Sequence, residues 1–168
     1  MANFYYDTRI KDLRIRTTNK SDVDLILSFI KGIAEYEKMT NEVIATKETL
    51  LKSIFELHQA EVLIAQYNNI PIGFALFFES FSTFIGHANM YLEDFYVNPE
   101  YRHNGFGKEI FRILALIAKE RGYERFEWTC LNWNTSAQEF YKKMGAVKMS
   151  EWTVHRLVKS QFQEIIDK

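Results

Sequence analysis

Residues 91–110 bring together the residue types that bind an anion. The stretch starts as an apolar strand that ends at Pro99, continues through a short loop with Arg102, Gly105 and Gly107, and enters an amphipathic helix. Glycines let the backbone approach a ligand closely, and the first N–H groups of a helix have no acceptor within it. Such groups attract negative charge. We therefore expect a phosphorylated cofactor at this loop.

Two common phosphate-binding loops do not match these residues. A Walker loop has Gly-Lys followed by Ser or Thr, whereas Lys108 is followed by Glu109, which offers no hydroxyl for a metal. A dinucleotide fingerprint has a third glycine three positions after the second, and Ile110 stands there. The pattern that remains is Arg-x-x-Gly-x-Gly, which begins at Arg102 and follows a strand.

The composition favours one globular domain over residues 1–168. This length suffices for one core and is short for two domains of ordinary size. The formal net charge of −1 gives no basic surplus for nucleic acid or an anionic membrane as a partner. A single cysteine, Cys130, indicates a reducing compartment, and no signal-peptide pattern is visible, so we expect a cytoplasmic protein. The four histidines lack ligand spacing, so no metal site is expected.

The elements that would position this loop follow from the apolar periodicity. Strands are predicted at 13–17, 61–67, 71–78, 90–97, 125–131, 147–149 and 152–158. Helices are predicted at 23–34, 46–56, 105–121 and from Asn134 or Thr135 to Gly145. The fold class is α/β, with a mixed central sheet of six to seven strands flanked by helices. The loop falls between the fourth strand and the third helix.

This element order and several separated sequence blocks resemble the GNAT N-acetyltransferases. Within that superfamily the chain is most similar to the diamine and thialysine N-acetyltransferases. The blocks are Tyr36-Glu-Lys-Met39, Ser82-Thr-Phe-Ile-Gly86, Tyr91-Leu-Glu-Asp-Phe-Tyr-Val97, Tyr101-Arg102, Trp133-Asn134 and Phe140-Tyr-Lys-Lys-Met-Gly-Ala146. The resemblance implies transfer of acetyl from acetyl-CoA to a primary amine, with no metal, in a homodimer.

The resemblance also implies which residues bind acetyl-CoA. The backbone of Phe95, Tyr96 and Val97 would pair with the pantetheine arm as an added strand does. Asn134 would either contact the cofactor or only cap a helix. The pyrophosphate would be received by Arg102 and by the amides of His103, Asn104, Gly105, Phe106, Gly107 and Lys108.

Two residues are candidates for the proton transfers of this reaction. The resemblance makes Tyr141 the acid that protonates the leaving thiolate, and the alternative is that Tyr141 packs in the core beside Phe140. Glu93 is the candidate base, acting directly or through water, because burial in an apolar strand would raise its pKa. Alternatively, Glu93 only accepts hydrogen bonds from nearby backbone. Asp94 should project from the opposite face of the sheet unless a bulge intervenes.

Substrate choice would depend on Glu37, on Glu93 and on the segment Ser82, Thr83 and Phe84. Glu37 lies in a cluster of acidic residues that would either hold a cationic amine or form a solvated face. Ser82-Thr83 resembles the thialysine branch, since polyamine-specific relatives tend to carry an acidic residue and proline there. A peptide N-acetyltransferase and a non-catalytic acyl-CoA-binding module are the alternatives to a small-molecule enzyme.

Overall fold

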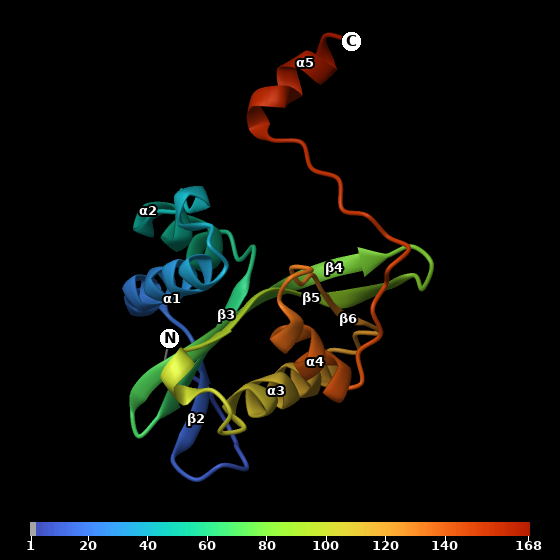
Figure 1. The fold of residues 1–168 in the computed structure, drawn as a ribbon. Coiled ribbons are helices and arrows are strands. Elements are labelled where there is room, and N and C mark those ends of the chain that lie inside the picture. The colour runs from blue at the N-terminus through green and yellow to red at the C-terminus, as the bar shows by residue number, and fades with distance from the viewer. Residues whose placement is uncertain (1–2) are drawn as a thin grey trace. The chain divides into compact units, whose positions relative to one another are not determined.

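The computed structural model describes residues 3–168 and divides into two compact units, residues 3–129 and residues 130–168. The first unit contains the central sheet and three of the helices (Figure 1). The second unit contains the remaining two helices. The expectation of a single domain stays a prediction.

The first unit is built on a six-stranded mixed sheet with the strands in sequence order. Neighbouring strands are antiparallel except for the last two, which are parallel. The strands are β1 Tyr5–Tyr6, β2 Leu13–Thr17, β3 Glu61–Tyr67, β4 Ile70–Ser82, β5 His87–Val97 and β6 Phe126–Trp128. The predicted mixed sheet is confirmed. The loop with Arg102, Gly105 and Gly107, which we name the glycine loop, lies between the predicted fourth strand, which is β5, and the third helix.

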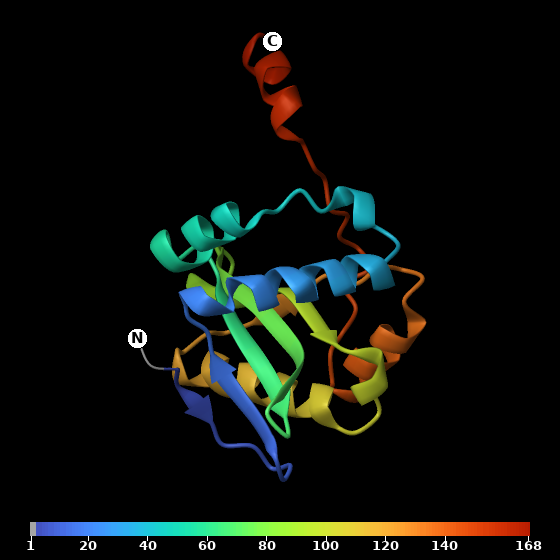
Figure 2. The same ribbon diagram turned by 90° about the vertical axis from the view of Figure 1, so that its left-hand side faces the viewer.

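The helices of the first unit cover both faces of this sheet (Figure 2). They are α1 Val23–Tyr36, α2 Lys47–Leu50, which continues as a π-helix over Leu51–Glu56, and α3 Phe106–Glu120. Ile26 and Phe29 of α1 and Ile54 of the π-helix pack with apolar residues of β3, β4 and β5 in one core cluster. On the opposite face, the ring of Phe111 in α3 contacts Phe126 of β6 at 4.9 Å between centroids.

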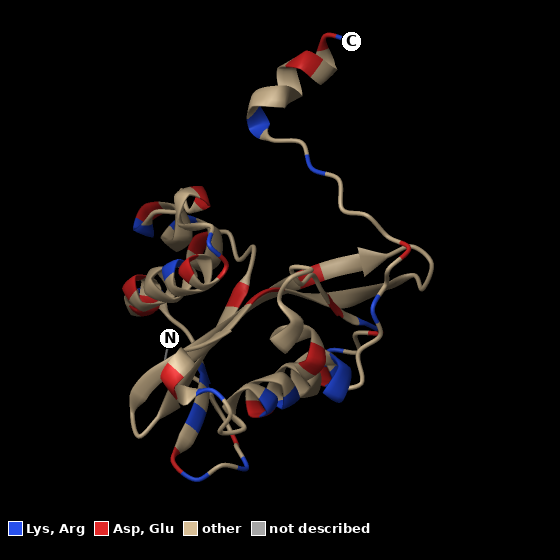
Figure 3. Cartoon of the chain, viewed as in Figure 1, with Lys and Arg blue, Asp and Glu red and all other residues tan. Residues whose placement is uncertain are grey.

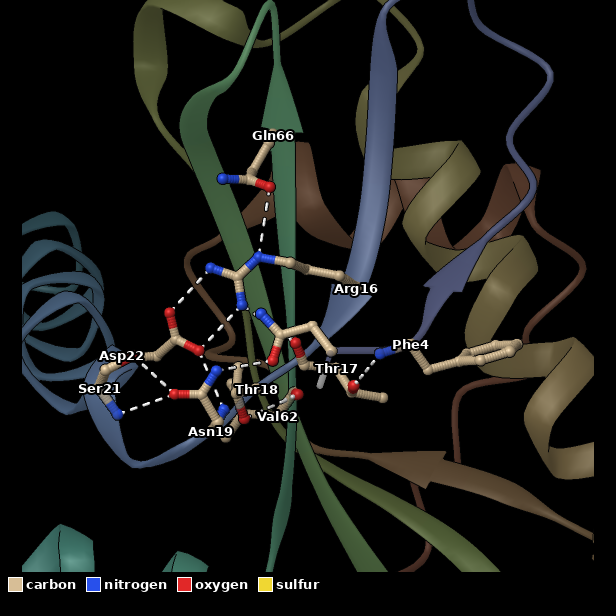
Figure 4. Close-up of polar contacts among 10 residues, drawn as sticks. Phe4, Arg16, Thr17, Thr18, Asn19, Ser21, Asp22, Val62 and Gln66 are labelled. Carbon is tan, nitrogen blue, oxygen red and sulfur yellow. Dashed lines mark hydrogen bonds and ion pairs between the residues drawn. The ribbon is translucent and has the colours of Figure 1, made fainter. Parts of the chain in front are cut away.

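A buried ion pair holds the start of α1 to the sheet (Figure 4). Arg16 of β2 donates two hydrogen bonds, of 2.9 and 2.8 Å, to the carboxylate of Asp22, and its Nε donates to Gln66 at 3.2 Å. Asp22 also accepts a 2.9 Å bond from the Asn19 N–H, and the Asn19 side chain accepts one from the Ser21 N–H. Every charge in this group therefore has a partner, as burial requires.

The second unit departs from the predicted strands. It contains α4 Thr135–Lys143 and α5 Phe162–Ile166, and the predicted strands 147–149 and 152–158 are wrong because neither segment forms a strand. A strand requires another strand to pair its backbone groups, and residues 130–168 provide none. β6 ends at Trp128, short of the predicted residue 131.

Charged residues of both signs are interspersed along the ribbon (Figure 3), as the net charge of −1 suggests. No helix within residues 3–168 is long and apolar enough to cross a membrane. In the same residues, no three His, Cys, Asp or Glu side chains are arranged to hold a metal ion.

Candidate active site

A one-residue bulge in β5 sets the directions of its acidic side chains. Asp94 lies opposite Leu76 of β4, whereas Leu92 lies opposite Phe77, so Glu93 is an extra residue between two consecutive pairs. A bulge leaves its extra residue without a cross-strand partner and bends the strand. The alternation of faces along β5 therefore shifts by one residue at Glu93.

Asp94 consequently faces α1. Its partner Leu76 belongs to the apolar core beneath α1, as does the next alternate pair, Phe74 and Tyr96. Residues directly opposite one another in an antiparallel pair project from the same face of the sheet. The sequence predicted opposite directions for Glu93 and Asp94 unless a bulge intervened, and the bulge is present.

Glu37, Glu93 and Asp94 form an acidic cluster at the carboxyl end of α1. Burial raises the pKa of the Asp94 carboxyl to about 6, and the negative charges of Glu93 and Glu37 add to the increase. Burial also raises the pKa of the Glu37 carboxyl, at the residue that follows α1. A carboxyl group that titrates near neutrality can accept a proton at physiological pH. The cluster can also attract a cation.

The desolvated carboxyl group in β5 is that of Asp94 rather than Glu93. The sequence predicted burial for Glu93, but its side chain is exposed. Glu93 is the extra residue of the bulge and has no cross-strand partner in β4 that would direct its side chain into the apolar packing on one face of the sheet. The predicted burial of Glu93 is therefore wrong, while its role as a base stays a prediction.

The edge of β5 next to the acidic cluster is open to strand pairing. β6 pairs only with Met90–Leu92, so its pairing with β5 stops before Glu93. The ring of Phe95 packs against Phe111 under α3, with 5.5 Å between ring centroids, and its backbone lies on this edge. The edge of a sheet is a template for another extended chain with amide groups.

The glycine loop that follows β5 has a strained and internally bonded backbone. His103 and Gly105 have φ values of 65° and 83°, in the left-handed region where glycine is favoured. The side-chain amide of Asn104 donates to the carbonyl groups of Tyr101 and Arg102, at 3.2 and 3.0 Å. These bonds fix the loop conformation and leave the His103 side chain exposed.

The glycine loop leads directly into α3, and the first N–H groups of α3 lie at the end that adjoins the loop. The N–H of Glu109 donates to the Gly105 carbonyl at 3.1 Å, which is the first turn of the helix. The N–H groups of Phe106, Gly107 and Lys108 precede this bond and so have no acceptor within the helix. An anion can be received at this end of α3.

Gly107 lets α3 approach β5 closely. A Cβ atom at Gly107 would lie 3.3 Å from Cζ of Phe95, which is tighter than an ordinary contact. The side chain of the preceding residue, Phe106, is buried with its ring 4.8 Å from that of Tyr67. Phe106 is therefore available to a ligand only through its backbone.

Arg102 points toward α1 rather than along the loop. Its Nε donates a 2.8 Å hydrogen bond to the carbonyl oxygen of Val97, the last residue of β5. Its guanidinium carbon lies 4.4 Å from the ring centre of Tyr36 and 5.5 Å from that of Tyr96. The side chain thus links the end of β5 to the last residue of α1.

Ser82–Phe84, the segment predicted to select the substrate, lies at the far end of the β4–β5 hairpin. Ser82 pairs with His87, while Asp94 of the acidic cluster pairs with Leu76 of β4. Positions 76 and 82 of one strand are roughly 20 Å apart at about 3.3 Å per residue. The Phe84 side chain is 87% exposed. The first unit does not bring this segment to the acidic cluster.

Tyr141 and Asn134 belong to the second unit. The Asn134 side-chain oxygen accepts a 3.2 Å bond from the Ala137 N–H, so Asn134 is the cap of α4. Contact of Asn134 with a cofactor stays a prediction. Tyr141 is half-buried in α4, and its ring meets that of Phe140 edge to face at 5.5 Å.

Sequence reasoning missed Asp94 and the Arg102–Tyr36 contact. The signal for Asp94 was present as two adjacent acidic residues within an apolar strand, since strict alternation would bury one of them. The Arg102–Tyr36 contact joins distant parts of the chain, so no local pattern announces it.

A family model described as the acetyltransferase (GNAT) family matches residues 30–146. That span includes the acidic cluster, the open edge of β5, the glycine loop and α4. The chain belongs to the GNAT acetyltransferase family. This GNAT protein is an acetyl-CoA-dependent N-acetyltransferase.

Individual relatives agree with this assignment. The GNAT chain is 33% identical over 166 residues to a thialysine N-epsilon-acetyltransferase of Bos taurus, covering 92% of this chain and 97% of that protein. It is 27% identical to an L-ornithine N5-acetyltransferase of Arabidopsis thaliana, covering 90% and 87%. The solved structure of an integron cassette protein of V. cholerae matches with a TM-score of 0.77 at 24% identity, covering 95% and 100%. That last likeness concerns the fold alone.

Proposed function

We propose that this GNAT enzyme acetylates the primary amine of a small cationic molecule, by direct attack on acetyl-CoA in a ternary complex. The candidate class is a thialysine- or lysine-like amino acid, or a diamine or polyamine. The observation that carries the proposal is the acidic cluster of Glu37, Glu93 and Asp94 beside the open edge of β5. It would place a cation site next to the binding site for the acetyl donor.

Acetyl-CoA would bind along β5 and across the glycine loop. Its pantetheine amides would pair with the backbone of Phe95, Tyr96 and Val97, as a strand added to a sheet edge does. Its pyrophosphate would accept hydrogen bonds from N–H groups between Gly105 and Lys108. The close approach of α3 to β5 at Gly107 supports this arrangement. It would let β5 contact the pantetheine arm while the start of α3 contacts the pyrophosphate of the same molecule.

The acidic cluster would bind and deprotonate the amine. An alkylammonium is attracted by the three carboxyl groups, but only the neutral amine can attack a thioester. Glu93 lies exposed at the bulge, and the carboxyl of Asp94 has a pKa raised to about 6, so this pair would take the proton directly or through water. The amine nitrogen then bonds to the acetyl carbonyl carbon.

Collapse of the tetrahedral intermediate breaks the bond between carbon and sulfur. The electron pair leaves with the sulfur, and Tyr141 would donate its phenolic proton to the thiolate. The products are the N-acetylated amine and free CoA. The proton held by the acidic pair returns to solvent, and Tyr141 regains one.

The choice of a small amine is supported by the similarity to relatives named for thialysine and ornithine acetylation. Both names describe amino acids with a side-chain amine. Ser82 and Thr83 lie roughly 20 Å along β4 from the acidic cluster, so the choice does not rest on them. Thialysine and ornithine are therefore the first candidates.

A panel of amines tests this proposal. Release of free thiol from acetyl-CoA would be measured with thialysine, lysine, ornithine, spermidine and a peptide with a free amino terminus. We expect the highest kcat/KM with an amino acid that has a side-chain amine. A clear preference for the peptide would overturn the small-molecule class, and a preference for spermidine would overturn the choice of an amino acid within that class.

A homodimer in the cytoplasm is the assembly and compartment expected from the resemblance and from the single cysteine. Light scattering on purified protein would measure the mass of the assembly. A monomer mass near 19.9 kDa at micromolar concentration would contradict the dimer.

A further inference from the structure

We infer that the Arg102 side chain is a positioning residue that fastens the carboxyl end of α1 to the end of β5, instead of binding the cofactor pyrophosphate. This inference rests on the proposed function, because the site that Arg102 would hold in place is the acidic cluster. It assigns to Arg102 a different task from the one that the loop motif predicts.

The bond to Val97 fixes the first point of attachment. The Arg102 Nε donates to the Val97 carbonyl oxygen at 2.8 Å, so one edge of the planar guanidinium is occupied at the end of β5. This bond also sets the plane of the group, because the N–H donors of guanidinium have a rigid geometry. The rest of the guanidinium is thereby directed over two aromatic rings.

Those rings fix the second point of attachment. The guanidinium carbon lies 4.4 Å from the ring centre of Tyr36 and 5.5 Å from that of Tyr96, which are distances of cation–π contacts. Tyr96 in turn lies against α1 at Gly32, where an added Cβ would be 3.2 Å from the ring. Tyr36, Arg102 and Tyr96 thus connect α1 with β5 at one place, which we name the arginine clamp.

The arginine clamp lies next to the acidic cluster on both elements. Glu37 directly follows Tyr36, and Asp94 stands two residues before Tyr96 in the same strand. Glu37 acts on the pKa of Asp94, so the end of α1 and the bulge of β5 have to be held close together. Loss of Arg102 would release the end of α1 and displace Glu37. Binding of the amine would then weaken more than binding of the cofactor.

Replacement of Arg102 tests the clamp when two acetyl donors are compared. S-acetylpantetheine lacks the pyrophosphate that acetyl-CoA carries. If Arg102 is a clamp, Arg102→Gln raises the KM for the amine about tenfold and lowers kcat by a similar factor with either donor. The Kd for CoA then changes by less than about threefold. A loss seen with acetyl-CoA alone, together with a tenfold weaker Kd for CoA, would overturn the inference.

Lysine at this position separates the two roles further. Arg102→Lys retains the positive charge that a phosphate needs, but an ammonium cannot bond Val97 in the plane of a guanidinium and cover Tyr36 as well. We expect Arg102→Lys to remain as impaired toward the amine as Arg102→Gln. Recovery of wild-type kinetics in Arg102→Lys would contradict the clamp.

A double-mutant cycle with Tyr36 completes the test. Tyr36→Leu removes the ring, and its effect on the amine KM should overlap with that of Arg102→Gln, so the double variant is no worse than either single one. Tyr36→Phe keeps the ring and should behave as the wild type does. Multiplied effects in the double variant would argue against a shared contact. If the wild type acetylated no amine, the proposed function would fail, and the same cycle measured by thermal unfolding would still decide the clamp.

Discussion

Glu37 at the end of α1 lies close enough to Asp94 in β5 for its charge to raise the pKa of the Asp94 carboxyl. The two residues come from different elements, and the bulge at Glu93 is what turns Asp94 toward α1. Like charges in a partly desolvated position destabilise the fold, and such strain persists where function requires it. We therefore expect substitutions in the acidic cluster to change the free energy of unfolding as well as the activity.

Asp94→Asn should stabilise the protein at neutral pH. Because the folded pKa of Asp94 is raised to about 6, the folded protein holds this proton more tightly than the unfolded chain does. Wild-type stability therefore falls as pH rises through the interval between the unfolded pKa, near 4, and 6. The advantage of Asp94→Asn should grow over that interval to about 3 kcal/mol at most and then level off. Chemical denaturation at pH 4 to 8 would measure it.

Glu93→Gln is the control for this measurement, because Glu93 is the neighbour of Asp94 and its own carboxylate is exposed. It should give a smaller gain, by removing only one of the charges that act on Asp94. A stability difference between Asp94→Asn and the wild type that does not change with pH would contradict the account of the acidic cluster.

Asp22→Asn should destabilise the first unit by about 3 kcal/mol, because it leaves the buried Arg16 without its counter-charge. Burial alone would raise the pKa of Asp22, but the Arg16 guanidinium and the Asn19 N–H hold it below its ordinary value. The contribution of Asp22 is therefore present above pH 4 and lost as pH falls through the folded pKa. Unfolding free energies at pH 7 and at pH 3 would show the difference shrinking.

Asp24→Asn provides the matched control for Asp22→Asn. Asp24 pairs with Lys47 on the surface, where 65% of its side chain is exposed, so a change of less than about 0.5 kcal/mol is expected. Equal losses for the two variants would show that the buried pair has no special role.

Gly73→Ala should disturb the strand that is proposed to bind the cofactor. A Cβ at Gly73 would lie 2.4 Å from the carbonyl oxygen of Tyr96 and 3.1 Å from Cα of Val97, so the backbone of β5 has to move. We expect a loss of about 1–3 kcal/mol in stability and weaker binding of CoA. Gly107→Ala is the comparison, because its nearest obstacle is the ring of Phe95, which can shift. A melting temperature of Gly73→Ala equal to that of the wild type would contradict the close approach.

Tyr141→Phe should lower kcat by about a hundredfold or more while leaving the affinity for CoA unchanged. The substitution keeps the ring and its edge-to-face contact with Phe140, so the packing of α4 is retained. Tyr123→Phe, which removes a hydroxyl that donates to Glu79, is the control and should keep the wild-type kcat. Turnover by Tyr141→Phe at the wild-type rate would exclude Tyr141 as the acid.

The sequence contained most of the fold and the location of the cofactor loop. Alternation in Leu13–Thr17 and the apolar run within Glu61–Tyr67 predicted those strands with their observed bounds, and the helical period predicted the helix after the loop at 105–121, one residue longer at each end than α3. The spacing of the two glycines predicted the position of the loop. The left-handed backbone at Gly105 and the close approach at Gly107 both require glycine.

The remaining features depend on partners that a local pattern does not specify. Residues 152–158 have the composition of a strand, yet the second unit offers them no strand to pair with. The bulge at Glu93 is a slip of one residue in register, which arises between β4 and β5 and not within either. The contact of Arg102 with Tyr36 is likewise a property of the folded chain.

The mass of the amine product tests the central claim most directly. Purified enzyme would be incubated with thialysine or ornithine and with acetyl-CoA that has an isotopically labelled acetyl group, and both products would be quantified by mass spectrometry. We predict one labelled N-acetyl group on the amine for each molecule of CoA released, with Asp94→Asn and Glu93→Gln slower than the wild type. CoA released without any acetylated amine, or label found on the protein in place of the amine, would contradict direct transfer to a small amine.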